Sequence, residues 1–193
     1  MMGIIRQYLT ALRFLLAVTL VVGVLYPVAV YGVGQVAFKH NAQGSFVTSN
    51  GQVVGSSLLG QNFPGVQWFH SRPSAAGKDG YDALSSAASN AGPNEPSLLE
   101  TINTRRADVA KAEGVQPSQV PADALTTSGS GLDPDISPAY AYLQANRVAG
   151  ARHLSVAAVN ALIDRQIQPR LFGFLGEPRI NVLELNIALS ALR

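Results

Sequence analysis

The sequence has 193 residues, no cysteine and a formal net charge of +2, but the charge is unevenly distributed. Residues 1–40 contain three basic residues and no acidic one, whereas residues 41–193 contain 11 basic and 12 acidic residues. This near-neutral balance excludes the concentrated basic surface that nucleic-acid binding requires, and the lack of cysteine excludes disulfides. About 150 residues are still enough for one domain with an ordinary hydrophobic core.

An uncharged apolar run from Phe14 to Phe38 predicts a membrane-spanning helix. Its 25 residues would be about 37 Å long as an α-helix, more than the roughly 30 Å of a bilayer's hydrocarbon core. Pro27 lies inside the run and is expected to kink the helix. A cleaved signal peptide is the alternative, with Gly32-Val33-Gly34 as its small-x-small site. We favour a retained anchor, because the apolar part of a signal peptide usually has about 7–15 residues.

The basic residues around this run indicate its orientation. Arg6 and Arg13 precede it, whereas Lys39 alone follows it closely. Basic flanks tend to stay in the cytoplasm. We therefore expect residues 1–13 inside the cell, residues 14–38 in the membrane and residues 39–193 outside the cytoplasm.

The external domain is expected to begin with β-structure and to continue with a long irregular stretch. Two extended segments, residues 45–48 and 52–56, flank an Asn-Gly pair that predicts a tight hairpin turn. A third extended segment is predicted at residues 66–70. Residues 71–97 are rich in Ser, Ala, Gly, Pro and Asn, and an irregular stretch of this length usually forms a functional or partner-contacting surface.

Four helices are predicted in the rest of the chain, from apolar periodicity and capping residues. Ser137, Ser155 and Asn181 are expected to cap the starts of three of them, and Gly114 to follow the end of another. The expected ranges are 97–113, 138–151, 156–168 and 182–192. The predicted fold class is therefore α+β: one transmembrane helix and one domain with a small sheet and several helices.

The densest group of small polar residues is Ser128-Gly-Ser-Gly-Leu-Asp-Pro134. Its backbone N–H groups could form an anion-binding nest, and Asp133 with Asp135 could hold a cation. The spacing of a nucleotide P-loop is missing. Because Gly, Ser and Asp are common in turns, we favour a tight connection that places Ser137 at a helix start.

A serine hydrolase is conceivable, with His70, a neighbouring serine and Asp79 or Asp82. However, the chain lacks a Gly-x-Ser-x-Gly elbow, and residues adjacent in sequence rarely converge as a triad. The three histidines are isolated from other metal-ligating residues. We therefore expect no catalytic residue and no metal site.

A series of short motifs follows in order along nearly the whole chain. They are Tyr26-Pro27, Val54-Gly-Ser56, Leu59-Gly-Gln-Asn-Phe63, Trp68-Phe-His-Ser-Arg-Pro-Ser74, Ala88-Ser-Asn-Ala-Gly-Pro93, Val120-Pro-Ala-Asp123, Thr127-Ser-Gly-Ser-Gly-Leu-Asp-Pro-Asp-Ile-Ser137, Gln144-Ala-Asn-Arg-Val-Ala149, Gly173-Phe-Leu-Gly-Glu-Pro178 and Asn181-Val-Leu-Glu-Leu-Asn186. Taken together, they resemble the C subunit of the Kdp-type potassium-transporting P-type ATPase. Small departures are Trp68, where the family more often has tyrosine, and Ala87-Ala88, where glycine and serine are usual.

The resemblance implies a non-catalytic accessory subunit of an ATP-driven, high-affinity potassium uptake complex in the bacterial inner membrane, with its domain in the periplasm. The implied partners are a channel-like subunit that carries potassium, a P-type subunit that hydrolyses ATP and a small membrane subunit. The family's C subunit is described as stabilising the assembly and as a catalytic chaperone that raises the pump subunit's affinity for ATP. ATP and potassium would thus be handled by the complex, and no directly bound cofactor is expected.

Nine positions are candidates for partner contacts or rigid loops: Tyr26, Pro27, Gln61, Phe63, Arg72, Pro73, Asn90, Asp133 and Arg147. Nucleotide contacts implied by the family would fall on Gln144, Ser128 and Ser130. Gln144 and Arg147 share one face of a predicted helix, which we expect to be solvated. Because ATP is cytoplasmic and the domain is expected outside, we favour an indirect effect on ATP affinity. A membrane-anchored hydrolase and a free-standing nucleotide- or ion-binding domain remain as alternatives.

Overall fold

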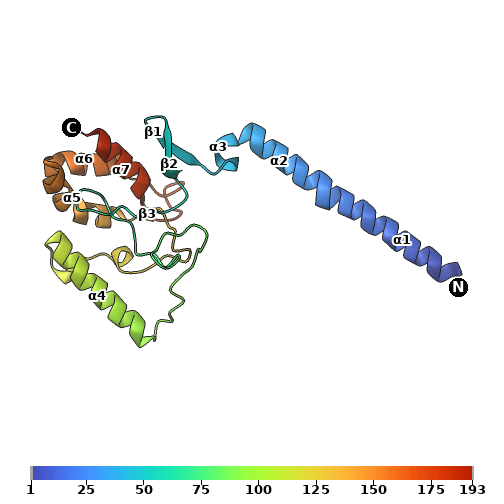
Figure 1. Ribbon diagram of the computed structural model, residues 1–193, viewed down its shortest axis with the longest axis horizontal. Coiled ribbons are helices and arrows are strands. Elements are labelled where there is room, and N and C mark those ends of the chain that lie inside the picture. The colour runs from blue at the N-terminus through green and yellow to red at the C-terminus, as the bar shows by residue number, and fades with distance from the viewer. Residues whose placement is uncertain (1, 193) are drawn as a thin grey trace. The chain divides into compact units, whose positions relative to one another are not determined.

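The computed structural model describes residues 2–192 and divides into two compact units, one up to Phe46 and one from Val47 onward. The first unit is a long helix followed by a short one (Figure 1). It comprises α1 (Met2–Val18), the π-helical segment η1 (Thr19–Leu25), α2 (Tyr26–Ala37) and α3 (Lys39–Ala42). Gly3–Ala37, with 35 residues, is within the described chain the one helix long and apolar enough to cross a membrane.

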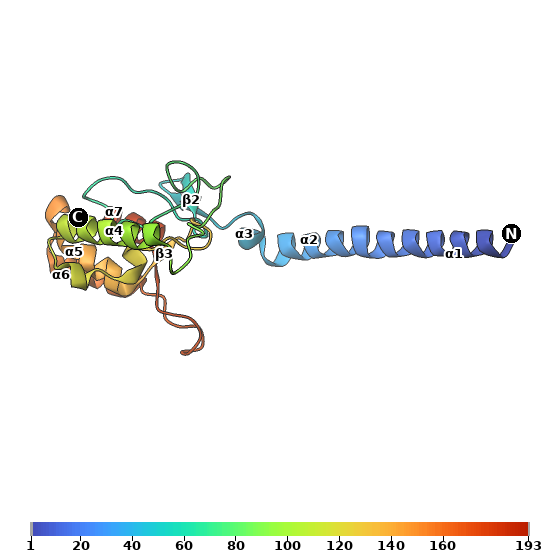
Figure 2. The same ribbon diagram turned by 90° about the horizontal axis from the view of Figure 1, so that it is seen from below.

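The helix accommodates Pro27 without the sharp kink that the sequence predicts. The seven residues Thr19–Leu25 are π-helical, and the Tyr26 N–H donates to the carbonyl of Val21. A π-helical segment changes the hydrogen-bond register, and such adjustments re-satisfy backbone groups that a proline would leave free. The ribbon passes this region without a sharp bend in either view (Figure 1, Figure 2).

The predicted hairpin is confirmed. β1 (Phe46–Ser49) and β2 (Gln52–Ser56) form a two-stranded sheet. Asn50 and Gly51 join them with φ angles of 51° and 79°. Positive φ at both central residues is what the tight hairpin turns of this class require, which explains the Asn-Gly pair.

The four predicted helices and their caps are also confirmed. The Ser137, Ser155 and Asn181 side chains each accept a hydrogen bond from a first-turn backbone N–H, and Gly114 ends a helix with φ 67°. The bounds are α4 (Pro96–Glu113), α5 (Pro138–Arg152), α6 (Val156–Gln166) and α7 (Val182–Ala191), with 3₁₀ turns η2 (Pro117–Gln119) and η3 (Ala122–Ala124) after α4. Two short strands, β3 (Asp135–Ile136) and β4 (Ile180–Asn181), pair antiparallel just before α5 and α7. The architecture is thus α+β.

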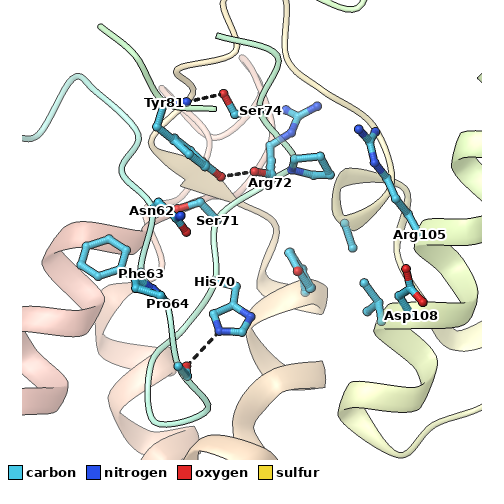
Figure 3. A pocket seen from close by; sticks show the side chains of 15 residues that line it. Asn62, Phe63, Pro64, His70, Ser71, Arg72, Ser74, Tyr81, Arg105 and Asp108 are labelled. Carbon is cyan, nitrogen blue, oxygen red and sulfur yellow. Dashed lines mark hydrogen bonds between the residues drawn. The ribbon is translucent and has the colours of Figure 1, made fainter. Parts of the chain in front are cut away.

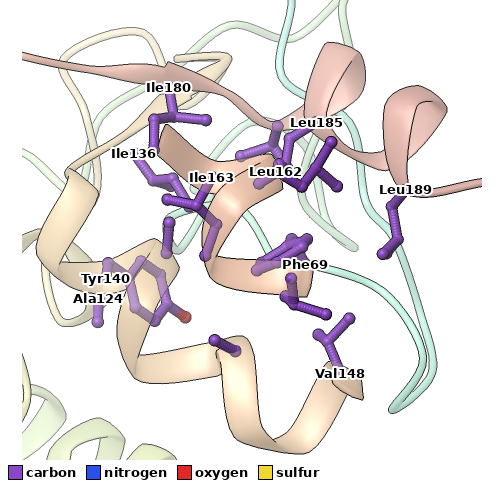
Figure 4. Close-up of a cluster of buried hydrophobic side chains, with 14 of the residues drawn as sticks. Phe69, Ala124, Ile136, Tyr140, Val148, Leu162, Ile163, Ile180, Leu185 and Leu189 are labelled. Carbon is purple, nitrogen blue, oxygen red and sulfur yellow. The ribbon is translucent and has the colours of Figure 1, made fainter. Parts of the chain in front are cut away.

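The hydrophobic core of the second unit lies among α5, α6 and α7 (Figure 4). Its largest completely buried apolar side chains come from these helices, from β4 and from one irregular segment. They are Phe69, Val148, Val159, Ile163, Ile180, Leu185 and Leu189. Phe69 therefore anchors a loop in a core that is otherwise mainly helical.

The prediction of a third extended strand at residues 66–70 is wrong. Val66 and Gln67 lie in a turn, in which the Trp68 N–H donates to the Gly65 carbonyl. Phe69 and His70 follow, and no strand within residues 2–192 pairs with them. Their backbone hydrogen bonds are made by side-chain amides of α5 and α7 instead, which satisfies buried backbone groups without a sheet.

Residues 168–179 form an antiparallel arm between α6 and β4. Gln168 and Arg179 exchange both backbone hydrogen bonds, and Leu171 and Leu175 form a second bridge. Figure 2 shows this arm, in orange-red, extending away from the helices of its unit.

Candidate functional site

The Gly/Ser-rich segment 128–135 joins the irregular parts of the domain to one another. The Gly60 N–H donates to the Leu132 carbonyl at 2.7 Å, and the Ser74 hydroxyl donates to the Gly131 carbonyl at 2.6 Å. The Ala87 N–H donates to the carbonyl of Ser130 at 3.0 Å. Gly131 has φ 68°, and a Cβ there would lie 2.5 Å from the Ala87 carbonyl oxygen. Close backbone packing therefore explains the small residues, as expected for a tight connection.

Arg72 and Asp133, two of the predicted positions, form a partly buried ion pair beside this segment. Arg72 Nη1 lies 2.8 Å from Asp133 Oδ2, and Asp133 Oδ1 accepts the Asp135 N–H. Arg72 Nη2 also reaches the Thr126 carbonyl at 3.5 Å. Among the residues that the structure describes, the buried Nε of Arg72 has no hydrogen-bond partner. Arg72 therefore links segments 54 and 61 residues away in the chain. Its Nε–H group remains available to donate to another acceptor.

A pocket of about 370 Å³ lies between this arginine and α4 (Figure 3). Arg105 of α4 donates to the Leu125 carbonyl, next to the carbonyl that Arg72 approaches, so adjacent peptide groups position the two guanidinium groups. His70, Tyr81 and Asp108 also line the pocket, and Tyr81 donates its hydroxyl proton to the Arg72 carbonyl. The two arginines suit a carboxylate or another small anionic group, and Asp108 adds a negative charge to the same lining.

A buried polar network surrounds Arg147 of α5. Its Nε contacts both Glu113 carboxylate oxygens, at 3.0 and 3.1 Å, and its Nη1 donates to the carbonyls of Val66 and Trp68 at 2.6 and 2.9 Å. The Arg147 and Glu113 side chains are only 9% and 3% exposed. Arg147 also donates to the Gln144 amide oxygen at 2.9 Å. The expectation that Gln144 and Arg147 lie on a solvated face is therefore wrong, because both are needed to satisfy groups in the interior.

Gln144 and Asn186 hold the backbone of two consecutive residues, His70 and Phe69. The Gln144 amide accepts the His70 N–H at 2.7 Å and donates to the His70 carbonyl at 3.2 Å. The Asn186 amide does the same for Phe69, with both bonds at 2.9 Å. Each amide thus replaces one residue of a partner strand, and Phe69 is held in the core by its backbone as well as its ring.

Burial dominates the electrostatics of this network. It raises the pKa of Glu113, and Arg147 offsets only part of that increase. It lowers the pKa of His70, and the positive charge of Arg147 adds to that decrease. Within the network, then, the protein favours neutral His70.

The residues of the hydrolase alternative lie in ordinary structural roles. The His70 ring shares a 3.0 Å hydrogen bond with the Gly65 carbonyl, and the Ser71 hydroxyl donates to the Gln61 carbonyl. Asp82 caps a local turn by accepting the Leu84 N–H. Across residues 2–192, no three His, Cys, Asp or Glu side chains gather as a possible metal site.

The sequence matches a known protein family over nearly the whole chain. The family described as "K+-transporting ATPase, c chain" (KdpC) matches residues 8–191. This chain belongs to the KdpC family.

Three relatives, each named "Potassium-transporting ATPase KdpC subunit", illustrate the similarity. The chain is 52% identical over 189 residues to the protein from Kineococcus radiotolerans, with 98% of this chain and 95% of the relative covered. It is 53% identical over 175 residues to that from Caulobacter vibrioides (90% and 87% covered) and 49% identical over 182 residues to that from Gemmatimonas aurantiaca (94% and 91% covered). The similarity therefore extends over both units.

In this KdpC chain, the remaining predicted positions have different surroundings. Tyr26 and Pro27 are exposed at the start of α2. Gln61 donates to the Val54 carbonyl and lines a 210 Å³ hollow together with Phe63. Pro73 lies beside Arg72 in the larger pocket.

The other candidate positions lie on the irregular surface. Asn90 is exposed and has φ 52°, a conformation that asparagine tolerates better than most residues. Ser130 accepts the Leu132 N–H, and its hydroxyl lies 3.4 Å from that of Ser128. The partner and nucleotide roles of all these residues stay predictions.

Sequence reasoning missed Glu113, Asn186 and the apolar tip of the arm. Asn186 could have been found as a polar residue on the apolar stripe of its helix, between Leu185 and Leu189. The tip could have been found as a run of large apolar residues between Pro169 and Pro178, where no helix fits. Glu113, at a helix end before Gly114, gives no local signal of burial.

Proposed function

We propose that this chain is a non-catalytic, membrane-anchored accessory subunit of a bacterial potassium-transporting ATPase. The observation that carries the proposal is the family match over both the helix and the domain. The proposed partners are the channel-like subunit that carries potassium, the P-type subunit that hydrolyses ATP and a small membrane subunit.

The proposed mechanism of assembly uses the two units differently. The helix Gly3–Ala37 leaves its apolar side chains exposed, so lipid and partner helices must cover them. Tyr26 and Pro27 are available on that helix for contact with partners. The domain acts as a rigid cap on the outer face of the partners, over the entrance for potassium. Its rigidity is supported by the buried Arg147 network, which fixes a loop that could otherwise move.

The proposed effect on ATP affinity is indirect. A subunit that binds one conformation of the pump more tightly increases the population of that conformation and thereby changes its affinity for ATP. The internal hydrogen bonds of Gln144 support this route, because its amide would have to leave the backbone of His70 to contact a nucleotide. The charge bias of residues 1–40 supports a periplasmic domain, on the side of the membrane away from ATP.

Co-purification tests the proposed subunit role. The tagged full-length chain, co-expressed with the other subunits of the proposed complex and extracted in detergent, should recover the channel-like and P-type chains, as identified by mass. The complex assembled with this chain should have a lower KM for ATP than the same preparation without it. Recovery of the chain alone would contradict the subunit role, and an unchanged KM would contradict the effect on ATP affinity.

The orientation can be tested directly because the chain has no cysteine. In spheroplasts, a membrane-impermeant maleimide should label Leu84→Cys, at a side chain that is 97% exposed. The matched variant Gln7→Cys, near the other end of the anchor, should react only after permeabilisation. The reverse pattern would place the domain in the cytoplasm and allow direct contact with ATP.

A further inference from the structure

The tip of the arm, Leu171–Leu175, carries the most concentrated group of exposed large apolar side chains in the second unit. Phe172 and Phe174 are 79% and 71% exposed, and Leu171 and Leu175 are 61% and 48% exposed. Together they offer on the order of 400 Å² of apolar surface. A patch of this size on a soluble domain usually marks an interaction site.

Hydrogen bonds within the arm define the shape of this tip. Leu171 and Leu175 exchange backbone hydrogen bonds of 2.9 and 3.0 Å, and the Gly173 N–H donates to the Arg170 carbonyl at 3.0 Å. Phe172 has φ 54°, a left-handed conformation that is unfavourable for an aromatic residue. The fold thus holds Phe172 in a strained position that exposes its ring. A pre-ordered aromatic tip loses little conformational entropy when it binds.

The charges at the base of the arm indicate what kind of surface the tip meets. Arg170 pairs with Glu177 across the arm at 2.6 Å, and Arg179 pairs with Asp135 at 2.9 Å. An apolar centre with a rim of both charge signs is the usual anatomy of a protein–protein interface. A loop that inserts into lipid usually has unpaired lysine or arginine for anionic head groups. The arm has no lysine, and both of its arginines are paired.

We propose that the tip Leu171–Leu175 inserts into an apolar recess, rimmed by charged residues, on another subunit of the same potassium-transporting assembly. This inference rests on the proposed function and adds the part of the chain that docks. Phe172 and Phe174 act as the two anchors, and the ion pairs at the base of the arm orient them against the rim of the recess.

The test compares the double variant Phe172→Ser, Phe174→Ser with the control Leu99→Ser in the co-expressed, detergent-extracted complex. Leu99 of α4 is also an exposed apolar residue, but it lies outside the arm and outside the irregular stretch 71–97. Loss of two aromatic anchors should lower the recovery of partner chains by on the order of tenfold, whereas the control should recover as much as the wild type. Because both phenylalanines are exposed, the variant should keep its thermal unfolding midpoint.

A photo-crosslink identifies the occupant. A benzophenone-bearing amino acid in place of Phe172 should crosslink to a partner subunit, identified by mass, and the same group in place of Leu99 should not. Crosslinks to lipid or to a second copy of this chain, or full recovery of partners by the double variant, would overturn the inference while leaving the proposed function intact. Failure of the wild-type chain to recover partners would overturn both.

Discussion

Residues 61–74 and the arm 168–179 both lack regular secondary structure, but different contacts hold them in place. Segment 61–74 inserts Phe69 into the core, and buried side chains of α5 and α7 bond to the backbone of residues 68–70. The arm bonds mainly to itself through its own backbone, and its apolar side chains point away from the core. Segment 61–74 is therefore part of the folded core, whereas the arm leaves its apolar side chains free to bind another molecule.

The strongest test of this comparison is Arg147→Ala. The substitution leaves Glu113 buried without a counter-charge and two carbonyls of the 66–70 loop without donors, so we expect a loss of about 3–5 kcal/mol of unfolding free energy. Chemical denaturation of the full chain in detergent measures it. Arg165→Ala, an exposed arginine on α6, should change stability by less than about 0.5 kcal/mol. Equal effects of the two variants would mean that the network does not hold the loop.

A smaller loss is expected for Asn186→Ala. It removes the amide that donates to and accepts from the Phe69 backbone and leaves both backbone groups buried, at a cost of about 1–3 kcal/mol. The control Ser190→Ala lies one turn further along α7 and is exposed. Thermal unfolding of the two variants should differ, and a midpoint for Asn186→Ala equal to that of the wild type would rule out this anchoring role.

A pH dependence of stability should follow from His70. Burial lowers its pKa below the usual 6.5, so at mildly acidic pH the unfolded chain binds a proton that the folded chain does not. Stability from this group is therefore present above the usual pKa and is lost as pH falls through the lowered one. His70→Gln should reduce the loss of stability between about pH 7.5 and about pH 5.5. Identical pH profiles for variant and wild type would contradict this.

The smallest effect on stability is expected at the tip of the arm. Phe172→Ser and Phe174→Ser remove side chains that are already in solvent, so the unfolding free energy should change by less than about 0.5 kcal/mol in each. The same denaturation measurement checks it. A loss of several kcal/mol would mean that the tip packs against its own domain, and the contrast with segment 61–74 would disappear.

Local signals predicted much of the fold because their physics is local. The Asn50-Gly51 turn, the caps at Ser137, Ser155 and Asn181, and the glycine after α4 each involve groups within a few residues of one another. The apolar helix at the N-terminus could be predicted for the same reason, since its length and composition are enough. Within this helix the accommodation of Pro27 differed, because a π-helical register is not visible in composition.

The sequence predicted which residues belong to the candidate site better than it predicted the contacts between them. Arg72 and Asp133 were both selected, and their ion pair joins residues 61 positions apart. Gln144 and Arg147 were placed on a common face, but the side of the helix that faces the core depends on which loop covers it. Glu113 and Asn186 were missed because nothing near them in sequence indicates their partners.

The sequence by itself determined the family, the apolar anchor and the helices with their caps, because these depend on composition and on neighbours along the chain. Only the tertiary structure decided which polar residues are interior and which apolar residues are outside. Asn186 bonds to a backbone 117 positions away, and Gln144 to one 74 positions away. Such contacts exist only once the chain has folded. The sequence alone does not determine them, because a buried backbone group can be satisfied equally well by a strand or by an amide from a distant helix.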